Sequence, residues 1–318
     1  MADENPVFYK AALLNTRQLQ RCTHNHLLYG GPHNYLHGEA PCVHHILGHS
    51  KAIATLLVHA NDIKNVKDYT RLQLPREAAK GVSSIKDIAT WLFSKGDWRG
   101  TVTANDQMYN IKGGHATGGA LSLLWHNKTG PLIVAGMTRY QITESTNMQR
   151  DRSGSDTNLT PRVEVIINGQ TYTNILDLAA RVSFTETAEA IRFNTQSRLT
   201  TETGNVLQKE KPDTFFDYTI TNNTVIIQLQ YNGSTPDAVQ YTLPIVCTKN
   251  ERVEVRSSTS ILIYKEKATV KVETTRPFRL TGDVKRIFHF VPGMEAVVLY
   301  FNDNEVRVTI SVQIRDGL

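Results

Sequence analysis

The residue types used in acid–base chemistry are concentrated near the N-terminus. Eight of the eleven histidines lie in the first sixty residues, and one turn among them carries His33, Tyr35, His37 and Glu39 at alternate positions. Tyrosine beside histidine suits β-elimination. One group removes the proton α to a uronate carboxylate, and another protonates the leaving glycosidic oxygen. The alternative interpretation is that Tyr35 and His37 anchor a loop on an adjacent helix.

A second candidate site is the glycine-rich segment 112–119, in which four glycines surround His115 directly before an apolar run. Glycine lets the backbone come very close to a neighbouring group, so we expect His115 to act in catalysis or substrate binding at the start of a strand. No Gly-Lys-Ser/Thr follows, so the segment is not a phosphate-binding loop. The alternative is a turn whose histidine faces solvent.

A metal site is a third candidate. His45 and His49 are four residues apart in a predicted helix, which places both rings on one face, and Glu39 upstream would add an oxygen ligand. The zinc-protease pattern His-Glu-x-x-His is absent. Histidines at this spacing also serve as hydrogen-bonded packing residues. We therefore expect no cofactor and keep a divalent metal near His45 and His49 as the alternative.

These candidates lie on two kinds of structure. Apolar residues at helical spacing predict helices over 7–28, 41–60 and 84–93. From Trp98 onward the apolar residues alternate, and turn signals recur every few residues, including Asn168-Gly169 in a predicted hairpin. We expect a mainly β fold: a large antiparallel multi-layer β-sandwich over 96–318, preceded by a small α-helical segment over 1–95.

Composition narrows the class of protein. The chain has 318 residues, of which 40% are hydrophobic and 20% charged, with a formal net charge of +5. This mild excess of positive charge is compatible with an anionic ligand. No apolar run approaches the about 20 residues that cross a bilayer, and the acidic N-terminus is unlike a secretory signal. Three scattered cysteines imply no disulfide framework. We expect neither a membrane nor a nucleic-acid partner.

The stretch from Trp98 to Arg150 resembles the start of the β-domain in heparinase II/III-like polysaccharide lyases. In that family an α/α toroid precedes a multi-layered antiparallel β-sandwich, and a cleft holds an anionic polysaccharide that tyrosine and histidine cleave by β-elimination. The resemblance implies that His115 is the histidine at the start of a β-domain strand that contributes to the site. The matching stretches are Asp97–Gly100, Gly114–Leu124, Met137–Tyr140 and Asn147–Arg150.

The same resemblance implies that Tyr35 or Tyr29, with His33 or His37, supplies the helical side of the site. Two departures from the family are visible. A second histidine and an aspartate usually follow the first histidine, where this chain has 116–118 as Ala-Thr-Gly, and there is room for only two or three helices. Residues 1–95 would then be the end of a toroid, in a C-terminal portion or a shortened relative, acting in the periplasm or outside the cell.

The favoured hypothesis is a lyase that cleaves an anionic, uronate-containing polysaccharide by β-elimination. Arg139 and Arg150 would bind carboxylate or sulfate through charge-assisted contacts, and Glu39 and Trp98 are further candidate substrate contacts. The alternatives are a glucuronidase-like glycoside hydrolase on the same plan, and a non-catalytic carbohydrate-binding or structural module. The sequence selects neither the sugar nor the oligomeric state.

Overall fold

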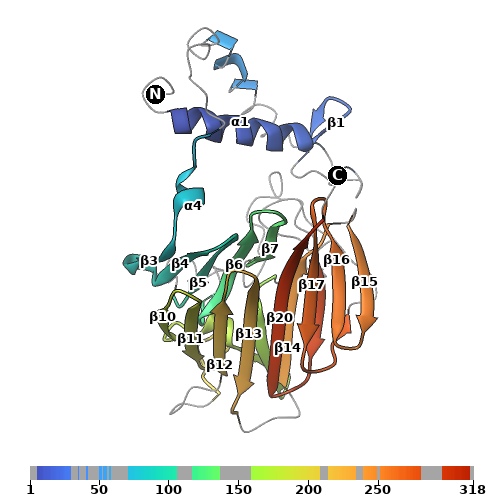
Figure 1. Cartoon of the computed structure of the whole chain (residues 1–318). Helices are drawn as coiled ribbons and strands as arrows, with labels where there is room; N and C mark the ends of the chain where they lie inside the picture. The colour runs from blue at the N-terminus through green and yellow to red at the C-terminus, as the bar shows by residue number, and fades with distance from the viewer. Residues whose placement is uncertain are drawn as a thin grey trace. The chain divides into compact units, whose positions relative to one another are not determined.

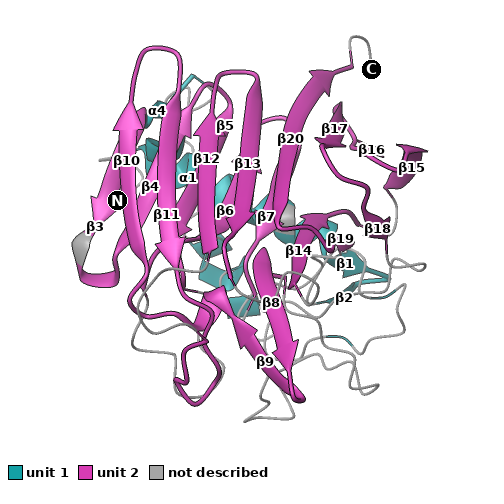
Figure 2. Ribbon diagram, turned by 90° about the horizontal axis from the view of Figure 1, so that it is seen from below, with its two compact units in different colours: residues 1–79, 142–151, 291–293 teal, residues 80–141, 152–290, 294–318 magenta. Residues whose placement is uncertain are grey.

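The structure is a computed structural model, and it divides the chain into two compact units (Figures 1 and 2). The N-terminal unit comprises 1–79, 142–151 and 291–293, and the C-terminal unit comprises 80–141, 152–290 and 294–318. The boundary between the helical segment and the β-sandwich was expected at residue 95, and these compact units divide the chain after residue 79. The described residues are 6–29, 35, 41, 50–51, 53–55, 57–58, 71–105, 117–136, 159–207, 214–233, 239–248, 251–280 and 296–315.

The first helix of the N-terminal unit, α1, spans Pro6–Arg21. Proline suits its first turn, and no glycine interrupts it. The prediction that it continues to residue 28 is wrong, because strands β1 (Thr23–His24) and β2 (Leu27–Leu28) form a tight hairpin there. The two turn residues, Asn25 and His26, have φ of 48° and 62°. These left-handed conformations belong to a two-residue turn that joins antiparallel strands.

A short helix, α4 (Pro75–Ala78), closes the described part of this unit. Lys10 of α1 donates to the carbonyl of Leu72 and lies 3.2 Å from the carboxylate of Glu77. That carboxylate also accepts the N–H of Leu74 at 2.8 Å, and this bond lowers the pKa of Glu77. These bonds join α1 to α4. In the predicted helix over 41–60, the described residues within 50–58 are helical.

The C-terminal unit begins with strands in the region predicted as the helix 84–93, so that prediction is wrong. Strand β3 (Gly81–Ile85) pairs with β4 (Thr90–Lys95) across the short 3-10 turn η2 (Lys86–Ile88). In β4, Phe93 is buried while its neighbour Leu92 is 37% exposed. This alternation is that of a strand, and the β-branched and aromatic residues of β4 favour it.

Three antiparallel sheets form the described part of this unit, and two of them have five strands each. One sheet runs in chain order from β3 and β4 through β5 (Trp98–Thr103), β6 (Ala120–His126) and β7 (Gly130–Val134). The other has the order β18 (Arg279–Leu280), β19 (Ala296–Phe301), β14 (Val239–Val246), β8 (Arg162–Ile167) and β9 (Gln170–Thr173). The predicted Asn168-Gly169 turn joins β8 to β9, with φ of 51° and 76°.

The third sheet has eight strands among the described residues. The alternation of buried and exposed residues that the sequence predicted is present in it. In β11, for example, Ile191 and Phe193 are buried while Arg192 and Asn194 are exposed. Its strands, in spatial order, are β10 (Arg181–Glu186), β11 (Ile191–Ser197), β12 (Thr214–Ile220), β13 (Thr224–Tyr231), β20 (Glu305–Ile314), β17 (Ala268–Thr274), β16 (Ser260–Tyr264) and β15 (Arg252–Ser257).

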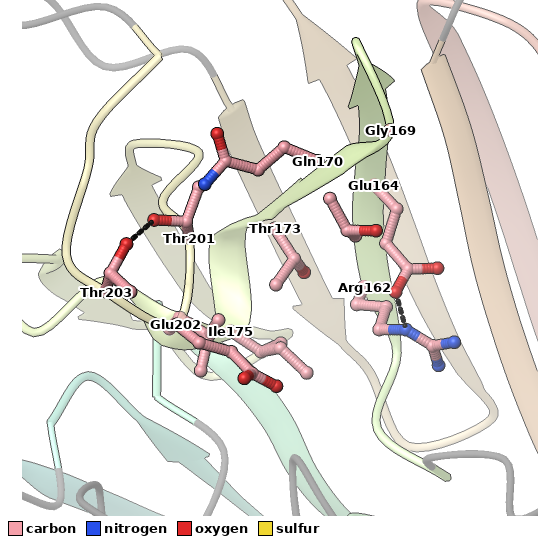
Figure 3. A pocket seen from close by; sticks show the side chains of 11 residues that line it. Arg162, Glu164, Gly169, Gln170, Thr173, Ile175, Thr201, Glu202 and Thr203 are labelled. Carbon is pink, nitrogen blue, oxygen red and sulfur yellow. Dashed lines mark hydrogen bonds and ion pairs between the residues drawn. The ribbon is translucent and has the colours of Figure 1, made fainter.

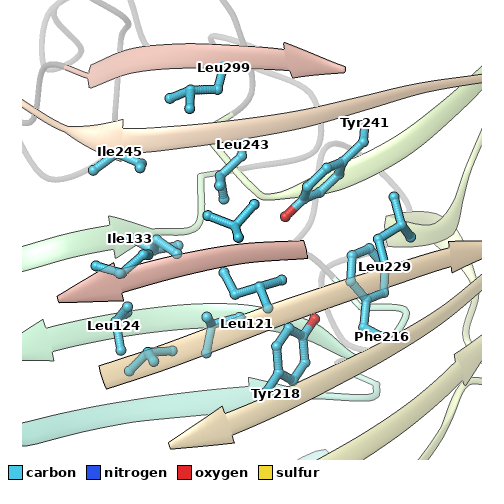
Figure 4. Close-up of a cluster of buried hydrophobic side chains, with 14 of the residues drawn as sticks. Leu121, Leu124, Ile133, Phe216, Tyr218, Leu229, Tyr241, Leu243, Ile245 and Leu299 are labelled. Carbon is cyan, nitrogen blue, oxygen red and sulfur yellow. The ribbon is translucent and has the colours of Figure 1, made fainter. Parts of the chain in front are cut away.

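One hydrophobic core joins the three sheets (Figure 4). The ring of Phe193 in the eight-stranded sheet lies 5.8 Å from Phe93 in the β3–β7 sheet. Phe216 of the same eight-stranded sheet lies 5.9 Å from Tyr241 in β14. The eight-stranded sheet therefore packs on both smaller sheets. The predicted fold class, a mainly β sandwich preceded by a small helical segment, is confirmed.

A buried histidine at the end of β6 links the stability of this unit to pH. His126 is 5% exposed, and its ring meets the indole of Trp98 edge-on at 4.6 Å. Burial lowers the pKa of His126, and Lys128 lowers it further, whereas Asp97 opposes the shift. In addition, Nδ1 of His126 accepts the N–H of Lys128 at 3.2 Å, so a proton on that nitrogen would break the bond.

The unfolding free energy of the C-terminal unit is therefore expected to fall as the pH drops below about 6.5, the ordinary histidine pKa. The unfolded state binds the proton more readily than the native state, so this contribution is complete above that value and is lost as the pH falls towards the lowered pKa. Urea unfolding, followed by tryptophan fluorescence, measures it, since all three tryptophans lie in β4–β6. His126→Asn keeps an acceptor and should flatten the slope; an unchanged slope would contradict the assignment.

Candidate functional site

The N-terminal unit holds a cluster of aromatic and imidazole side chains. The ring of Tyr35 is stacked on His24, with centroids 3.7 Å apart and planes inclined by 4°. Tyr29 packs against Tyr35 from another direction, at 6.0 Å and 60°. All three side chains are partly exposed. The cluster therefore holds a phenol and an imidazole side by side, each of them partly exposed.

The β1–β2 hairpin fixes two members of this cluster. His24 ends β1, and Tyr29 follows β2, where its N–H donates to the carbonyl of Cys22 at 2.9 Å. Burial raises the pKa of the Cys22 thiol, so this cysteine stays protonated at neutral pH. The hairpin thus holds the imidazole and a second phenol at fixed points around Tyr35. Phenol and imidazole are both groups that transfer protons in general acid–base catalysis.

In the C-terminal unit, the described end of the glycine-rich segment is anchored on a short 3-10 turn, η4 (Asn174–Leu176). Both the N–H and the hydroxyl of Thr117 donate to the carbonyl of Ile175, at 3.2 and 3.0 Å. The N–H of Gly118 donates to the carbonyl of Ala104 at 3.1 Å. Three hydrogen bonds therefore hold Thr117 and Gly118, which lie two and three residues after His115.

The glycines at this anchor are required by close contacts within the chain. Gly118 has φ +71°, and a Cβ there would lie 1.9 Å from the carbonyl oxygen of Asn174. Gly119 has φ +73°, and its Cβ would lie 2.6 Å from the Cβ of Thr195. The buried hydroxyl of Tyr218 donates to the carbonyl of Gly119 at 3.1 Å. The predicted close approach of this backbone is real, and at these two residues it is made to η4 and β11.

The same turn η4 forms part of a polar cavity of about 460 Å³ (Figure 3). Among its lining residues, Arg162 is 7% exposed, and its Nε lies 2.7 Å from the carboxylate of Glu164. Figure 3 shows Thr173 between this ion pair and the hydrogen-bonded hydroxyls of Thr201 and Thr203, which are 3.0 Å apart. The remaining lining residues are Gly169, Gln170, Thr171, Ile175, Leu176 and Glu202.

Comparison with known proteins identifies the family. Residues 82–315 match the ulvan lyase C-terminal domain, and residues 1–77 match the ulvan lyase N-terminal domain. The chain belongs to the ulvan lyase family. It is 35% identical to the broad-specificity ulvan lyase of Formosa agariphila over 319 residues, which is 99% of this chain and 50% of that protein. The predicted class, a polysaccharide lyase family, is confirmed.

Two solved structures match the chain at low similarity. Heparan sulfate lyase HepC from Pedobacter heparinus matches this ulvan lyase family chain with a TM-score of 0.48 and 8% identity, over 84% of this chain and 42% of that one. The α-galactosidase AgaB from Geobacillus stearothermophilus has a TM-score of 0.35 and 9% identity, over 73% and 41%.

Most of the site residues predicted for this ulvan lyase family member lie outside the described residues. Tyr35 and Tyr29 are the exceptions among the candidate catalytic groups. The structure brings Tyr35 to Tyr29, which was named from the sequence, and to His24, which was not. The candidates outside the described residues are His33, His37, Glu39, His115, Arg139 and Arg150, together with His45 and His49 of the proposed metal site. Within the described part of the chain, no three His, Cys, Asp or Glu side chains are grouped to hold a metal ion.

Trp98 is placed differently from its predicted role as a substrate contact. It is 0% exposed, and its indole belongs to the core and packs on His126. A side chain without accessible surface does not contact a ligand, so in this structure Trp98 stabilises the sandwich. The alternation that begins at residue 98 already indicated this: Trp98 and Gly100 point inward, while Arg99 and Thr101 are partly exposed.

Neither His24 nor the cavity was predicted from the sequence. His24 falls inside the predicted helix 7–28, and only the Asn25-His26 pair, a hairpin-turn signal, marked the break. Arg162 and Glu164 are two residues apart on β8 and therefore share one face of the strand. This shared face could be predicted from the sequence. The threonines that complete the cavity come from a loop distant in sequence, and no pattern connects them.

Proposed function

We propose that this protein is a polysaccharide lyase that cleaves an anionic, uronate-containing polysaccharide by β-elimination, with ulvan as the first substrate to test. The observation that carries the proposal is the match to both ulvan lyase domains along nearly the whole chain. The chain spans half the length of its curated relative, whose name is broad-specificity ulvan lyase. Action in the periplasm or outside the cell is part of the proposal, because the resemblance to polysaccharide lyases implies it.

The proposed reaction has two proton transfers, one from the carbon α to the carboxylate and one to the leaving glycosidic oxygen. A base removes the proton α to the uronate carboxylate, and the freed electron pair forms a double bond to the neighbouring carbon. The glycosidic C–O bond on that carbon breaks, and an acid protonates the leaving oxygen. Neutralising the carboxylate makes the α proton acidic enough to remove. The residues therefore divide into proton-transfer groups and carboxylate-binding groups.

Tyr35 is the proton-transfer group with the best structural support. Its ring is held by stacking on His24 and is partly exposed. A phenol that transfers a proton to or from a substrate must be accessible in this way. We propose that His33 and His37, in the same turn, share the acid and base roles with Tyr35. His24 is a positioning residue, because its parallel stack fixes the plane of the phenol.

We propose that carboxylate binding comes from His115, Arg139 and Arg150, with Glu39 contacting sugar hydroxyls. The resemblance of Trp98–Arg150 to the heparinase II/III-like lyases supports His115, which precedes the anchored Thr117 by two residues. Arginine forms paired, charge-assisted hydrogen bonds with carboxylate and sulfate groups.

Among the described helices, none is long and apolar enough to cross a membrane.

The test is an ultraviolet assay with ulvan, heparan sulfate and polygalacturonate. β-Elimination leaves a double bond conjugated to the carboxylate, so absorbance is expected to rise with at least one of them. We propose that no metal takes part, so a chelator should leave the rate unchanged. A chelator-sensitive rate would instead favour the His45–His49 site. New reducing ends without ultraviolet absorbance would show that the protein is a hydrolase and not a lyase. If no polysaccharide gives a product, the interpretation that remains is a non-catalytic carbohydrate-binding module.

A further inference from the structure

A group of charged side chains lies at the margin of the eight-stranded sheet that ends with β15 (Figure 1). It occupies the outer side of β15, β16 and β17 together with Arg315, which follows β20, and we call it the β15–β17 face. Ile263 and Val270, which pair across β16 and β17, are buried in the core, whereas Tyr264 and Lys271 beside them are partly exposed. The β15–β17 face is therefore the side of the sheet opposite the core.

The ring of Tyr264 holds two guanidinium groups. Arg252 is the cross-strand partner of Tyr264, and its guanidinium carbon lies 3.9 Å from the centre of the ring. The guanidinium carbon of Arg315 lies 4.9 Å from the same centre, and its Nε donates to the hydroxyl of Thr269 at 3.2 Å. Cation–π attraction favours both positions. Because the two arginines share one ring, two positive charges are held close together, and an anion between them would relieve their repulsion.

A single carboxylate fixes the ring without neutralising both arginines. Glu254 accepts the hydroxyl of Tyr264 at 2.5 Å, and Nη1 of Arg256 lies 2.9 Å from it. Nη1 of Arg252 lies 3.6 Å from the same carboxylate, which is beyond hydrogen-bonding distance. The side chain of Arg252 is exposed, so its N–H groups are accessible to a ligand.

Positive charge is in excess on the β15–β17 face. Its described charged side chains are four cations and two carboxylates: Arg252, Arg256, Lys271, Arg315, Glu254 and Glu273. Lys271 pairs with Glu273 at 2.8 Å, and Glu254 offsets one arginine. Glu266 and Lys267, in the turn between β16 and β17, have opposite charges and add none. The remaining positive charge favours an anionic ligand.

The spacing of the arginines favours a polymer over a small anion. A single exposed ion contact contributes little to binding. Arg252 and Arg256 are four residues apart on β15, so about 13 Å separates their backbones. A chain with repeated carboxylate or sulfate groups can contact both arginines, and contacts that are linked in one ligand reinforce each other. The guanidinium fork also matches the paired oxygens of these groups.

The environment of Tyr264 favours a polysaccharide over a nucleic acid. Sites for single-stranded nucleic acid use aromatic rings on which bases stack. Here the guanidinium of Arg252 already lies over the ring, and the phenol hydroxyl is bonded to Glu254. The face therefore offers cationic hydrogen-bond donors and no uncovered aromatic platform at Tyr264. Carboxylate and sulfate groups on a sugar chain require only the donors.

We propose that the β15–β17 face is a non-catalytic binding surface for anionic polysaccharide, centred on the guanidinium groups of Arg252 and Arg315. The proposal rests on the proposed function for its class of ligand. It adds a surface of the C-terminal unit that contains none of the residues proposed for catalysis. Such a surface raises the local concentration of the polymer and holds a long chain between successive cleavages.

The experiment measures binding of the full chain to fluorescently labelled dextran sulfate and carboxymethyl dextran by fluorescence anisotropy. Neither polymer contains uronate, so a β-eliminating lyase does not consume it, and the two separate sulfate from carboxylate recognition. At least one is expected to bind, more weakly as the salt concentration rises, while unmodified dextran does not. Replacing both arginines, Arg252→Gln with Arg315→Gln, should raise the Kd about tenfold.

Arg181→Gln with Arg192→Gln is the matched control. Both arginines lie on the outer side of the same sheet, on β10 and β11 at the opposite margin, and both are exposed. This variant loses the same charge and should keep the wild-type Kd within a factor of about two. Arg252→Lys with Arg315→Lys keeps the charge but loses the planar fork and its stacking, so it should still raise the Kd about threefold.

Several results would overturn the proposal: no binding of either charged dextran, equal losses in the glutamine variant and its control, or wild-type binding by the lysine variant. Tighter binding of single-stranded DNA through the same two arginines would assign the surface to nucleic acid instead. The ultraviolet assay is run on the same protein. Unsaturated product without binding of a charged dextran refutes the surface alone. Binding that depends on Arg252 and Arg315, without unsaturated product from any polysaccharide, refutes the lyase alone.

Discussion

A Tyr35→Phe variant is expected to form unsaturated uronate about 10²- to 10⁴-fold more slowly than the wild-type chain, the range for loss of a general acid or base. Phenylalanine keeps the ring that stacks on His24 at 3.7 Å, so the hairpin and its neighbours should remain in place. Only the hydroxyl that transfers the proton is removed. Initial rates by ultraviolet absorbance, at saturating and at low polysaccharide, give kcat and kcat/KM separately, and both should fall together.

Tyr9→Phe is the matched control for this experiment. Tyr9 lies in α1 of the same unit and has no proposed part in the reaction, so its variant should keep the wild-type rate within a factor of about two. Tyr29→Phe distinguishes the two tyrosines that the family resemblance left open. A large loss in Tyr29→Phe with normal rates in Tyr35→Phe would transfer the proton-transfer role to Tyr29, whose ring lies 6.0 Å away.

Replacing Gly118 with alanine is expected to lower the unfolding free energy of the C-terminal unit by roughly 3 kcal/mol. A left-handed backbone costs a residue with a Cβ about 1–2 kcal/mol, and forcing an atom into a packed site costs about 1–3 kcal/mol more. Both apply here, because φ is +71° and the new Cβ would lie 1.9 Å from a backbone oxygen of η4. Urea unfolding monitored by tryptophan fluorescence measures the loss.

Gly130→Ala separates the two costs. Gly130 has φ +76°, but its Cβ would meet only the ring of Trp125, at an ordinary 3.9 Å. This control should therefore lose only the backbone part, about 1–2 kcal/mol. Equal losses in the two variants would show that contact with η4 does not hold the glycine-rich segment.

The sandwich could be predicted from the sequence because strand periodicity is a local property. The turn at Asn168-Gly169 and the alternation of β11 can be read within a few residues, and both are present in the structure. The helix predicted over 84–93 was wrong because a local pattern does not include pairing with other strands. Ile88, Trp91 and Leu92 fit helical spacing, but pairing of β4 with β3 and β5 outweighed it.

The candidate site was less predictable because it depends on contacts between distant residues. The turn around Tyr35 was identified from its residue types alone. Its stack on His24 required knowing that the chain folds back at Asn25-His26. Similarly, the glycines at 118 and 119 predicted a close approach of the backbone, but they did not predict that Asn174 would be the neighbour.

The two outermost strands of the eight-stranded sheet have a consequence for solubility. An exposed strand edge invites pairing with another chain, and charged side chains or an irregular backbone oppose it. Strand β15 has both: its pairing is irregular between Val255 and Ser257, and the side chains of Arg252 and Arg256 are 66% and 55% exposed. Strand β10, at the opposite margin, begins and ends with exposed charged residues. The sheet is thereby protected from growing into fibrils by edge-to-edge addition.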